Sequence, residues 1–369
     1  MIPFFKSWSK AKTRGQIFPS LKTILQTEGP ITIERYMETV LHDAEYGYYK
    51  KGEPVGVGRD FVTAPEISQM FGEILGFWCL DTWQRMGSPN PFVLLELGPG
   101  NGTMLHDLLT FTQAVPAFHK AVHVRLFEAN MTLREKQKRR INDPSLQFCE
   151  DLSTLEPWPT LVLANEFFDT MPLRQFVKEG ELWRETRIAY DGEKMFFAMD
   201  EKLQSLPEGT LKKEFWAKKE DGWVYETSAA ARNFAKQIAR HIKTCGGGGL
   251  FIDYGYVAPP GEGSLAGWRQ GDFEDILTHP GKTDVTADVD FSSLCRWLDE
   301  EGVRVISPVT QGAFLSEWGI DARAAFLAKS VPNRVRRKID ETIHLLTSSD
   351  GMGELWKVLA FYGPSVRGA

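Results

Sequence analysis

The stretch LLELGPGNGTMLHDLL, residues 94–109, joins an apolar strand to a helix through a loop that contains three glycines. Glu96 stands near the end of the strand, and Gly98, Gly100 and Gly102 follow at alternate positions. Glycine lets the backbone turn sharply and approach a ligand closely, and the first turn of the helix offers free N–H groups. The stretch therefore predicts a ligand-binding loop, with a tight turn that binds no ligand as the alternative.

The spacing of these glycines separates the cofactor classes. A P-loop needs the pattern GxxxxGK[ST], and the dinucleotide fingerprint GxGxxG needs a glycine where Thr103 stands. An acidic residue followed by GxGxG instead resembles motif I of the class I S-adenosyl-L-methionine (SAM) methyltransferases. The resemblance implies that SAM is the cofactor and that Glu96, Gly98, Gly100 and Gly102 lie in its binding site.

Strands and helices alternate around this loop. We predict strands at residues 92–97, 122–129, 146–149, 160–165 and 250–255, and helices at residues 103–113, 132–141 and 228–243. A glycine break is expected at 246–249, and the last strand, 355–363, has no helix after it. This alternation predicts an α/β fold with a mostly parallel, Rossmann-like sheet.

The N-terminal region departs from the alternation. Residues 20–45 have helical spacing, a loop rich in Gly and Tyr covers 41–61, and a further helix is predicted from Thr63, where Thr63 and Glu66 have the spacing of a capping box. We therefore expect a helical cap with a cofactor-covering loop over residues 1–90.

A second departure follows the strand at 160–165. Turn signals at Gly180 and Gly192 separate strand-like runs, which predicts an antiparallel insertion over about 173–225 on the substrate side. The methyltransferase domain itself is expected to cover residues 91–369.

The composition excludes several classes of protein. The 369 residues are 42% hydrophobic and carry a formal net charge of −6, which disfavours a nucleic-acid-binding surface. No apolar run approaches the roughly 20 residues that span a bilayer, and the N-terminus lacks a secretory apolar core, although a weak organellar address is an alternative. We expect a cytoplasmic protein. The four cysteines and seven histidines show no metal-ligand spacing, so no metal is expected.

Acidic residues stand at the ends of the predicted strands. Glu128 ends the second strand, where a carboxylate in a SAM methyltransferase is expected to receive two ribose hydroxyls, with an acid stabilised by the N-terminus of the next helix as the alternative. Asp151, before Leu152, follows the third strand and is placed near the adenine, with an ordinary loop acid as the alternative. Because ligands of open α/β sheets bind beyond the carboxyl ends of the strands, these residues and the segment ANEFFD (164–169) are expected at one edge.

Several motifs together resemble the MidA family of class I SAM-dependent methyltransferases. They are YGYY, DFVTAPEISQMFGE, ELGPGNG, ANEFFDTMPLRQF, IDYGY and DVTADVDF, and they occur in the family's order between about residues 30 and 320. The resemblance implies a seven-stranded sheet with an antiparallel last strand. It also implies kinship with a mitochondrial complex I assembly factor that methylates an arginine of a protein. One departure is Arg59, which stands where the family usually has glycine.

This resemblance and the chemistry of guanidinium binding suggest roles for the segment 165–169. A guanidinium offers a planar fork of donors that two carboxylates can hold and orient. Glu166 is predicted as the chief guanidinium-binding carboxylate, Asp169 as the second one, and Asn165 as a bridge between cofactor and substrate. The alternatives are an acid held by backbone donors for Glu166 and a turn cap for Asp169.

Other residues are predicted around these three. Phe167 and Phe168 are expected to be half core and half pocket wall, while Asp253 and Tyr254 are expected to line the acceptor pocket or to be ordinary strand-end residues. Thr63 and Glu66 are expected to close over the methionine end of SAM, with the capping box as the alternative.

Three functions follow from this pattern. The leading one is a protein-arginine methyltransferase; a methyltransferase of small molecules at oxygen or nitrogen is the second, and a SAM-binding assembly factor that mainly holds a partner is the third. A homodimer is a further possibility, because the insertion offers a docking surface.

Overall fold

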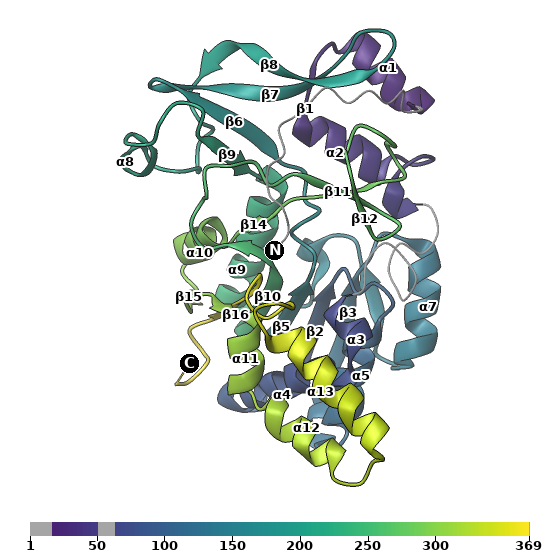
Figure 1. Cartoon of the computed structure of the whole chain (residues 1–369). Coiled ribbons are helices and arrows are strands. Elements are labelled where there is room, and N and C mark those ends of the chain that lie inside the picture. Colours follow the sequence, from purple (N-terminus) through teal and green to yellow (C-terminus); the bar gives the residue numbers. More distant parts are fainter. Residues whose placement is uncertain (1–16, 51–62, 369) are drawn as a thin grey trace.

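The computed structural model describes residues 17–50 and 63–368. The predicted loop with Gly56, Gly58 and Arg59 lies outside the described residues. A central mixed sheet occupies one half of the molecule, and a second, antiparallel sheet with the N-terminal helices occupies the other half (Figure 1). The α/β prediction is confirmed.

Among the described residues the central sheet has nine strands, whereas the family resemblance implied seven. Seven of them form one path in the order β15-β17-β10-β5-β2-β3-β4, and β14 and β16 pair at its side. Neighbours from β10 to β4 are parallel, whereas β17 is antiparallel to β10 and β15. The strands are β2 (Phe92–Leu97), β3 (Val122–Phe127), β4 (Gln147–Cys149), β5 (Thr160–Asn165), β10 (Gly247–Tyr256), β14 (Val289–Asp290), β15 (Arg304–Val305), β16 (Val309–Thr310) and β17 (Trp356–Tyr362).

Both faces of the central sheet are covered by helices. Alternate residues of β2 point to opposite sides: Phe92 and Leu94 belong to one buried cluster, and Val93 and Leu95 to the other. Burial on both faces explains why the strand is apolar throughout. The first cluster includes α4 (Gln69–Arg85), α5 (Thr103–Thr112), α6 (Pro116–Ala121), α7 (Met131–Ile141), α11 (Gln311–Glu317), α12 (Ile320–Ala328) and α13 (Asn333–Thr347); the second includes α9 (Ala229–Cys245) and α10 (Phe291–Glu300).

The glycines at 246–249 do not form a break, because Gly247 to Gly249 lie within β10. A Cβ at Gly247 would lie 1.9 Å from the carbonyl oxygen of Thr160, and one at Gly249 would lie 2.4 Å from the ring of Phe361. Glycine is therefore required by the close approach of the neighbouring strands rather than by a turn.

The predicted helix over 20–45 is two helices, α1 (Pro19–Thr27) and α2 (Ile33–His42), separated by the two-residue strand β1 (Ile31–Thr32). The strand β1 pairs antiparallel with β7 of the insertion, with Ile31 opposite Ile188. The N-terminal helices and the insertion thus share one sheet and one buried cluster, which includes Leu21, Tyr36 and Ile188.

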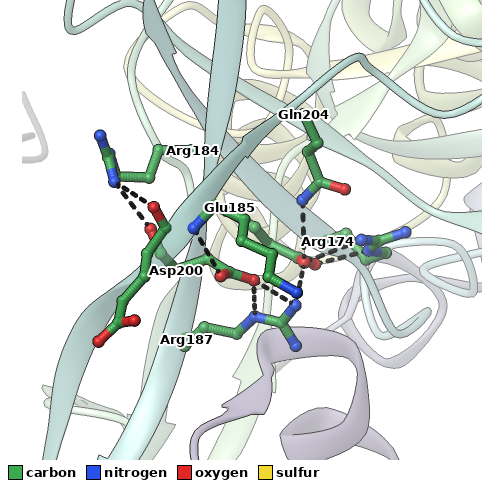
Figure 2. Close-up of polar contacts among 8 residues, drawn as sticks. Arg174, Arg184, Glu185, Arg187, Asp200 and Gln204 are labelled. Carbon is green, nitrogen blue, oxygen red and sulfur yellow. Dashed lines mark hydrogen bonds and ion pairs between the residues drawn. The ribbon is translucent and has the colours of Figure 1, made fainter.

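The insertion is antiparallel, as the turn signals predicted. Its strands are β6 (Arg174–Glu179), β7 (Leu182–Tyr190), β8 (Met195–Gln204) and β9 (Val224–Thr227), and the short helix α8 (Lys213–Trp216) lies between the last two. The carboxylate of Glu185 is fully buried between Arg174 and Arg187 (Figure 2). A third, small sheet consists of β12 (Asp272–Glu274), β11 (Ala266–Arg269) and β13 (Asp284–Thr286).

Candidate active site

The glycine loop after β2 has a backbone that favours glycine at each predicted position. Gly98, Gly100 and Gly102 have φ angles of 62°, 51° and 75°, in the left-handed region. Gly102 is the N-cap of α5, so the loop leads directly into the free N–H groups of a ten-residue helix. A Cβ at Gly98 would lie 2.9 Å from the ring of Phe167, so the loop after β5 packs against the glycine loop.

Glu128 lies just beyond β3, beside the same loop. Its Oε1 accepts a hydrogen bond from the backbone N–H of Asn130 at 2.7 Å, and its Oε2 accepts one from Gln137 Nε2 at 3.1 Å. The same Nε2 donates to the carbonyl oxygen of Gly100 at 2.7 Å. Gln137 therefore fixes Glu128 relative to the glycine loop, and burial raises the pKa of Glu128.

Glu96 is a buried acid beneath this loop. It is 2% exposed, and its Oε2 has no hydrogen-bond partner within the described part of the chain. Burial and the charge of Glu128 raise the pKa of Glu96 to about 8. An unpaired buried oxygen is costly unless a ligand donates to it. One buried and one half-buried acid, Glu96 and Glu128, therefore lie beside the glycine loop, where the sequence predicted the SAM site.

Glu66 contacts the glycine loop rather than the end of its own helix. The capping-box interpretation is wrong, because the Thr63 side chain accepts no cap hydrogen bond and α3 (Ala64–Ile67) ends after one turn. Glu66 Oε1 instead accepts hydrogen bonds from Thr103 Oγ1 at 2.6 Å and Asn101 Nδ2 at 3.2 Å. Ser68 caps the next helix, α4.

Asp151 and Leu152 follow β4 at the same edge. Both oxygens of Asp151 accept hydrogen bonds from Ser153, which lower the pKa of Asp151, and Asp151 is the N-cap of the 3-10 helix η2 (Leu152–Thr154). Leu152 is buried in the second apolar cluster. Their contribution to adenine binding stays a prediction.

The loop after β5 is held by a single buried carboxylate. Asp253 Oδ2 accepts hydrogen bonds from the backbone N–H groups of Phe167, Phe168 and Asp169 at 3.2, 3.0 and 3.2 Å. Glu166 has a φ angle of 50°, a conformation that costs a side-chain-bearing residue about 1 kcal/mol. Asp253 thus orients the segment that carries the predicted catalytic residues.

The two predicted guanidinium-binding acids are neighbours. Burial and the charge of Asp169 raise the pKa of Glu166 to about 8. Burial raises the pKa of Asp169 to about 6, opposed by a hydrogen bond that Tyr254 Oη donates to Asp169 Oδ2 at 3.0 Å. Asn165 Nδ2 donates to Glu166 Oε1 at 3.3 Å. Glu166, Asp169, Asn165 and Tyr254 are therefore brought together as the sequence predicted.

The two phenylalanines differ in their surroundings. Phe168 is 5% exposed and packs against Phe251 in the core, with ring centroids 4.7 Å apart. Phe167 is partly buried and lies between Gly98 and Phe234. Phe167 is thus the better placed of the two to be a pocket wall.

Two further residues lie at this site and were not assigned to it from the sequence. Tyr49, in the 3-10 helix η1 (Tyr48–Lys50), donates from its hydroxyl to Asp284 Oδ1 at 2.9 Å. The negative charge of Asp284 contributes to the raised pKa of Glu166. Asn130 Nδ2 donates to the Tyr49 carbonyl oxygen at 2.8 Å, which ties η1 to the end of β3. The sequence did contain a signal for Tyr49 and Asp284, since they lie in the family motifs YGYY and DVTADVDF.

The described residues hold neither a cluster suited to a metal ion nor a helix able to span a membrane. No group of three or more His, Cys, Asp or Glu side chains is arranged to hold a metal ion in residues 17–50 and 63–368. In the same ranges no helix has the length and apolarity needed to span a membrane.

The mixed sheet, the helices and the glycine loop are those of a SAM-dependent methyltransferase, and the comparisons with known proteins establish the family. Residues 74–309 match a family model described as "Putative S-adenosyl-L-methionine-dependent methyltransferase". The chain belongs to this family, and the predicted MidA resemblance, the methyltransferase activity and the SAM cofactor are confirmed.

The relatives extend over most of the chain. It is 31% identical to the protein arginine methyltransferase NDUFAF7, mitochondrial, of Xenopus laevis, with 90% of this chain and 81% of that protein covered. Identity to the human protein of the same name is also 31%, with 97% and 88% covered. A crystal structure of a COG1565 superfamily member from Burkholderia thailandensis, bound to S-adenosyl-homocysteine, superimposes with a TM-score of 0.80 at 26% identity and covers 94% of this chain and 91% of its own.

These relatives also correct one prediction. The expectation of a cytoplasmic protein is wrong, because the named relatives are mitochondrial proteins.

Proposed function

We propose that this protein transfers the methyl group of SAM to a nitrogen of an arginine side chain in a partner protein. One observation carries the proposal: Glu166 and Asp169 are neighbouring carboxylates at the carboxyl end of β5, and no Lys or Arg among the described residues pairs with either. Two acids without a cation are suited to a substrate that brings the cation. The names of the relatives, protein arginine methyltransferase, agree with this substrate.

The proposal gives each predicted residue a role. SAM supplies an electrophilic methyl group when bound; Glu96, the glycine loop and Glu128 hold it at one end of the site, and Asp151 and Leu152 lie on the adenine side. Glu66 and Thr63 belong to the N-terminal cap, residues 1–90, and close over the methionine end of SAM.

On the acceptor side, Glu166 and Asp169 hold the guanidinium in a bidentate grip, so that one nitrogen points at the methyl group. Asn165 and Tyr254 orient these carboxylates, and Phe167 excludes water. The insertion, about 173–225, receives the partner protein. In this proposal the seven strands of the main path correspond to the seven-stranded sheet of class I methyltransferases.

The protonation state of Glu166 decides whether the acceptor side of the site can bind an arginine. A protonated Glu166 cannot grip a guanidinium or accept its proton, so the free protein is mostly not ready for arginine below about pH 8. Binding of the cation favours the ionised form of Glu166, because an opposite charge lowers the pKa of a carboxyl.

The test is methyl transfer from labelled SAM to proteins of a cell lysate, followed by hydrolysis and identification of the labelled amino acid. Wild type is compared with Glu166→Gln, which keeps the shape and removes the charge, and with Glu317→Gln, an exposed acid at the end of α11 and outside the insertion, as a control. We expect labelled methylarginine with wild type and with Glu317→Gln, and its loss with Glu166→Gln.

Other outcomes would favour the alternatives. Label only in small molecules would replace the protein acceptor by a small one. SAM binding by calorimetry without any transfer would favour an assembly factor that acts by holding its partner.

A further inference from the structure

A cavity of about 40 Å³ lies against Asp169. Its walls come from the loop after β5, the start of α9, the end of β10, the segment before α10 and α10 itself. The polar residues that line it include Asp169, Glu226, Ser228, Tyr256, Asp288 and Asp290. A polar cavity holds water once it exceeds roughly 10–15 Å³, so this one has room for water molecules.

Two of the acids in this cavity are occupied by structural hydrogen bonds. Glu226 accepts hydrogen bonds from Gln175 at 2.9 Å and from Ser264 Oγ at 2.5 Å. Asp290 is the N-cap of α10 and accepts from the backbone N–H of Ser293 at 3.0 Å and from its hydroxyl at 2.6 Å. These two acids hold the walls together.

The other two acids are placed differently. Asp169 is 6% exposed, and its Oδ1 is buried without a hydrogen-bond partner within residues 17–50 and 63–368. Asp288 is partly exposed, so it links the cavity to solvent. Burial and the charge of Glu226 raise the pKa of Asp288 to about 6, close to that of Asp169. Both acids therefore accept a proton more readily than an ordinary aspartate does.

Methylation of an arginine creates a proton that must leave. The nitrogen lone pair forms the new N–C bond, the S–C bond breaks with its electron pair going to sulfur, and one N–H bond of the guanidinium gives up its proton. The neighbouring Glu166 accepts that proton, and the site is reset only when the proton has moved on.

We propose that this proton leaves through the cavity, from Glu166 to Asp169, then through cavity water to Asp288 and into solvent. The inference rests on the proposed function, because a methyl acceptor that loses no proton would need no such path. It assigns Asp288, on the segment between β13 and β14, a role in the reaction at a distance from the substrate.

Several titratable groups face the two ends of this path. Those that face Asp169 are Glu166, Asp253, Tyr254 and Tyr49. Those that face Asp288 are Glu226, Tyr256 and Lys357. Lys357, on β17, is the one cation in this set, and its charge favours the ionised form of Asp288.

The test measures the initial rate of methylarginine formation in a lysate protein, in dilute buffer and with added imidazole. Variants are Asp288→Ala, Asp288→Glu and, as a control, Asp299→Ala, an exposed acid near the end of α10. We expect Asp288→Ala to lower the rate about tenfold in dilute buffer. Imidazole, a small diffusible proton acceptor, is expected to restore most of the rate. Asp288→Glu and Asp299→Ala are expected to keep the wild-type rate, and SAM affinity by calorimetry is expected to be equal in all four proteins.

The outcomes separate the two proposals. Equal rates for Asp288→Ala and wild type, or a loss that imidazole does not relieve, would overturn the proton path while leaving arginine methylation intact. Absence of methylarginine with the wild-type protein would instead overturn the proposed function, and the proton path with it.

Discussion

Two carboxylates of this protein, Glu185 and Glu166, have opposite surroundings, the first being fully buried and the second partly buried. Glu185, in β7, is 0% exposed and accepts charged hydrogen bonds from Arg174 at 2.6 and 2.8 Å, with Arg187 at 2.8 Å (Figure 2). Glu166, after β5, has Asp169 beside it and no cation among the described residues. The first acid finds its countercharge within the fold, whereas for the second we propose that the substrate supplies it.

The sharpest test of this difference is the replacement of Glu166 by Gln. Loss of a carboxylate that grips the substrate and accepts its proton is expected to lower the rate of methyl transfer about 10²–10⁴-fold. The free energy of unfolding at neutral pH is expected to stay equal or to rise, because a partly buried acid without a countercharge is removed. Chemical denaturation and labelled-SAM assays measure the two quantities. A large loss of stability without a loss of activity would mean that Glu166 is structural.

The opposite pattern is expected at Glu185. Replacement of Arg174 by Met leaves this buried carboxylate short of a partner, which costs about 3 kcal/mol of unfolding free energy. The control is Arg184→Met, since Arg184 pairs with the half-exposed Glu179, and a pair at the surface contributes below about 1 kcal/mol. SAM affinity is expected to remain unchanged in both variants. Equal losses of unfolding free energy in the two variants would show that a buried carboxylate loses no more stability than a surface one when its arginine is removed.

The central sheet could be predicted from the sequence because its strands are buried on both faces. The predicted strands at 92–97 and 160–165 coincide with β2 and β5, since a run of apolar residues bounded by polar loops leaves little choice of boundary. The edge that carries Glu128, Glu166 and Tyr254 was also predictable, because parallel strands end together.

The remaining features depend on contacts between distant parts of the chain. The pair Tyr49–Asp284 spans 235 residues, and β1 is a two-residue strand whose partner lies in the insertion. Neither is visible in local periodicity. Glu66 has the spacing of a capping box, but its partner Thr103, 37 residues away, competes successfully for the carboxylate. Local signals fail where a side chain has a better acceptor or donor elsewhere.

The glycine loop allows a test at the cofactor end of the site. Gly98→Ala forces a Cβ to 2.9 Å from Phe167 at a φ angle of 62°, so Phe167 or the loop must move. Gly180→Ala is the matched control, because its φ angle is 60° and nothing lies within 4 Å of the added Cβ. Both variants are expected to lose about 1 kcal/mol of stability through backbone strain. Gly98→Ala alone is expected to weaken SAM binding, by about tenfold, in calorimetry. Equal SAM affinity in the two variants would place the cofactor away from Gly98.

The pH dependence of stability is a further test of Glu166, and it has a definite sign. Glu166 has a pKa of about 8 in the folded protein, against about 4.3 in an unfolded chain. Between these values the folded state holds a proton that the unfolded state has released. The contribution of Glu166 to stability is therefore fully present below about pH 4.3, and it is lost progressively as the pH rises to about 8.

Glu166→Gln removes this loss, so the unfolding free energies of the variant and wild type are expected to diverge in favour of the variant between pH 5 and pH 8. Because Glu96, Asp169 and Asp288 also have raised pKa values, the difference between the two proteins is the informative quantity, and chemical denaturation at several pH values measures it. A constant difference across this range would mean that Glu166 is already ionised in the free protein. Its charge would then be balanced before the substrate arrives, as that of Glu185 is.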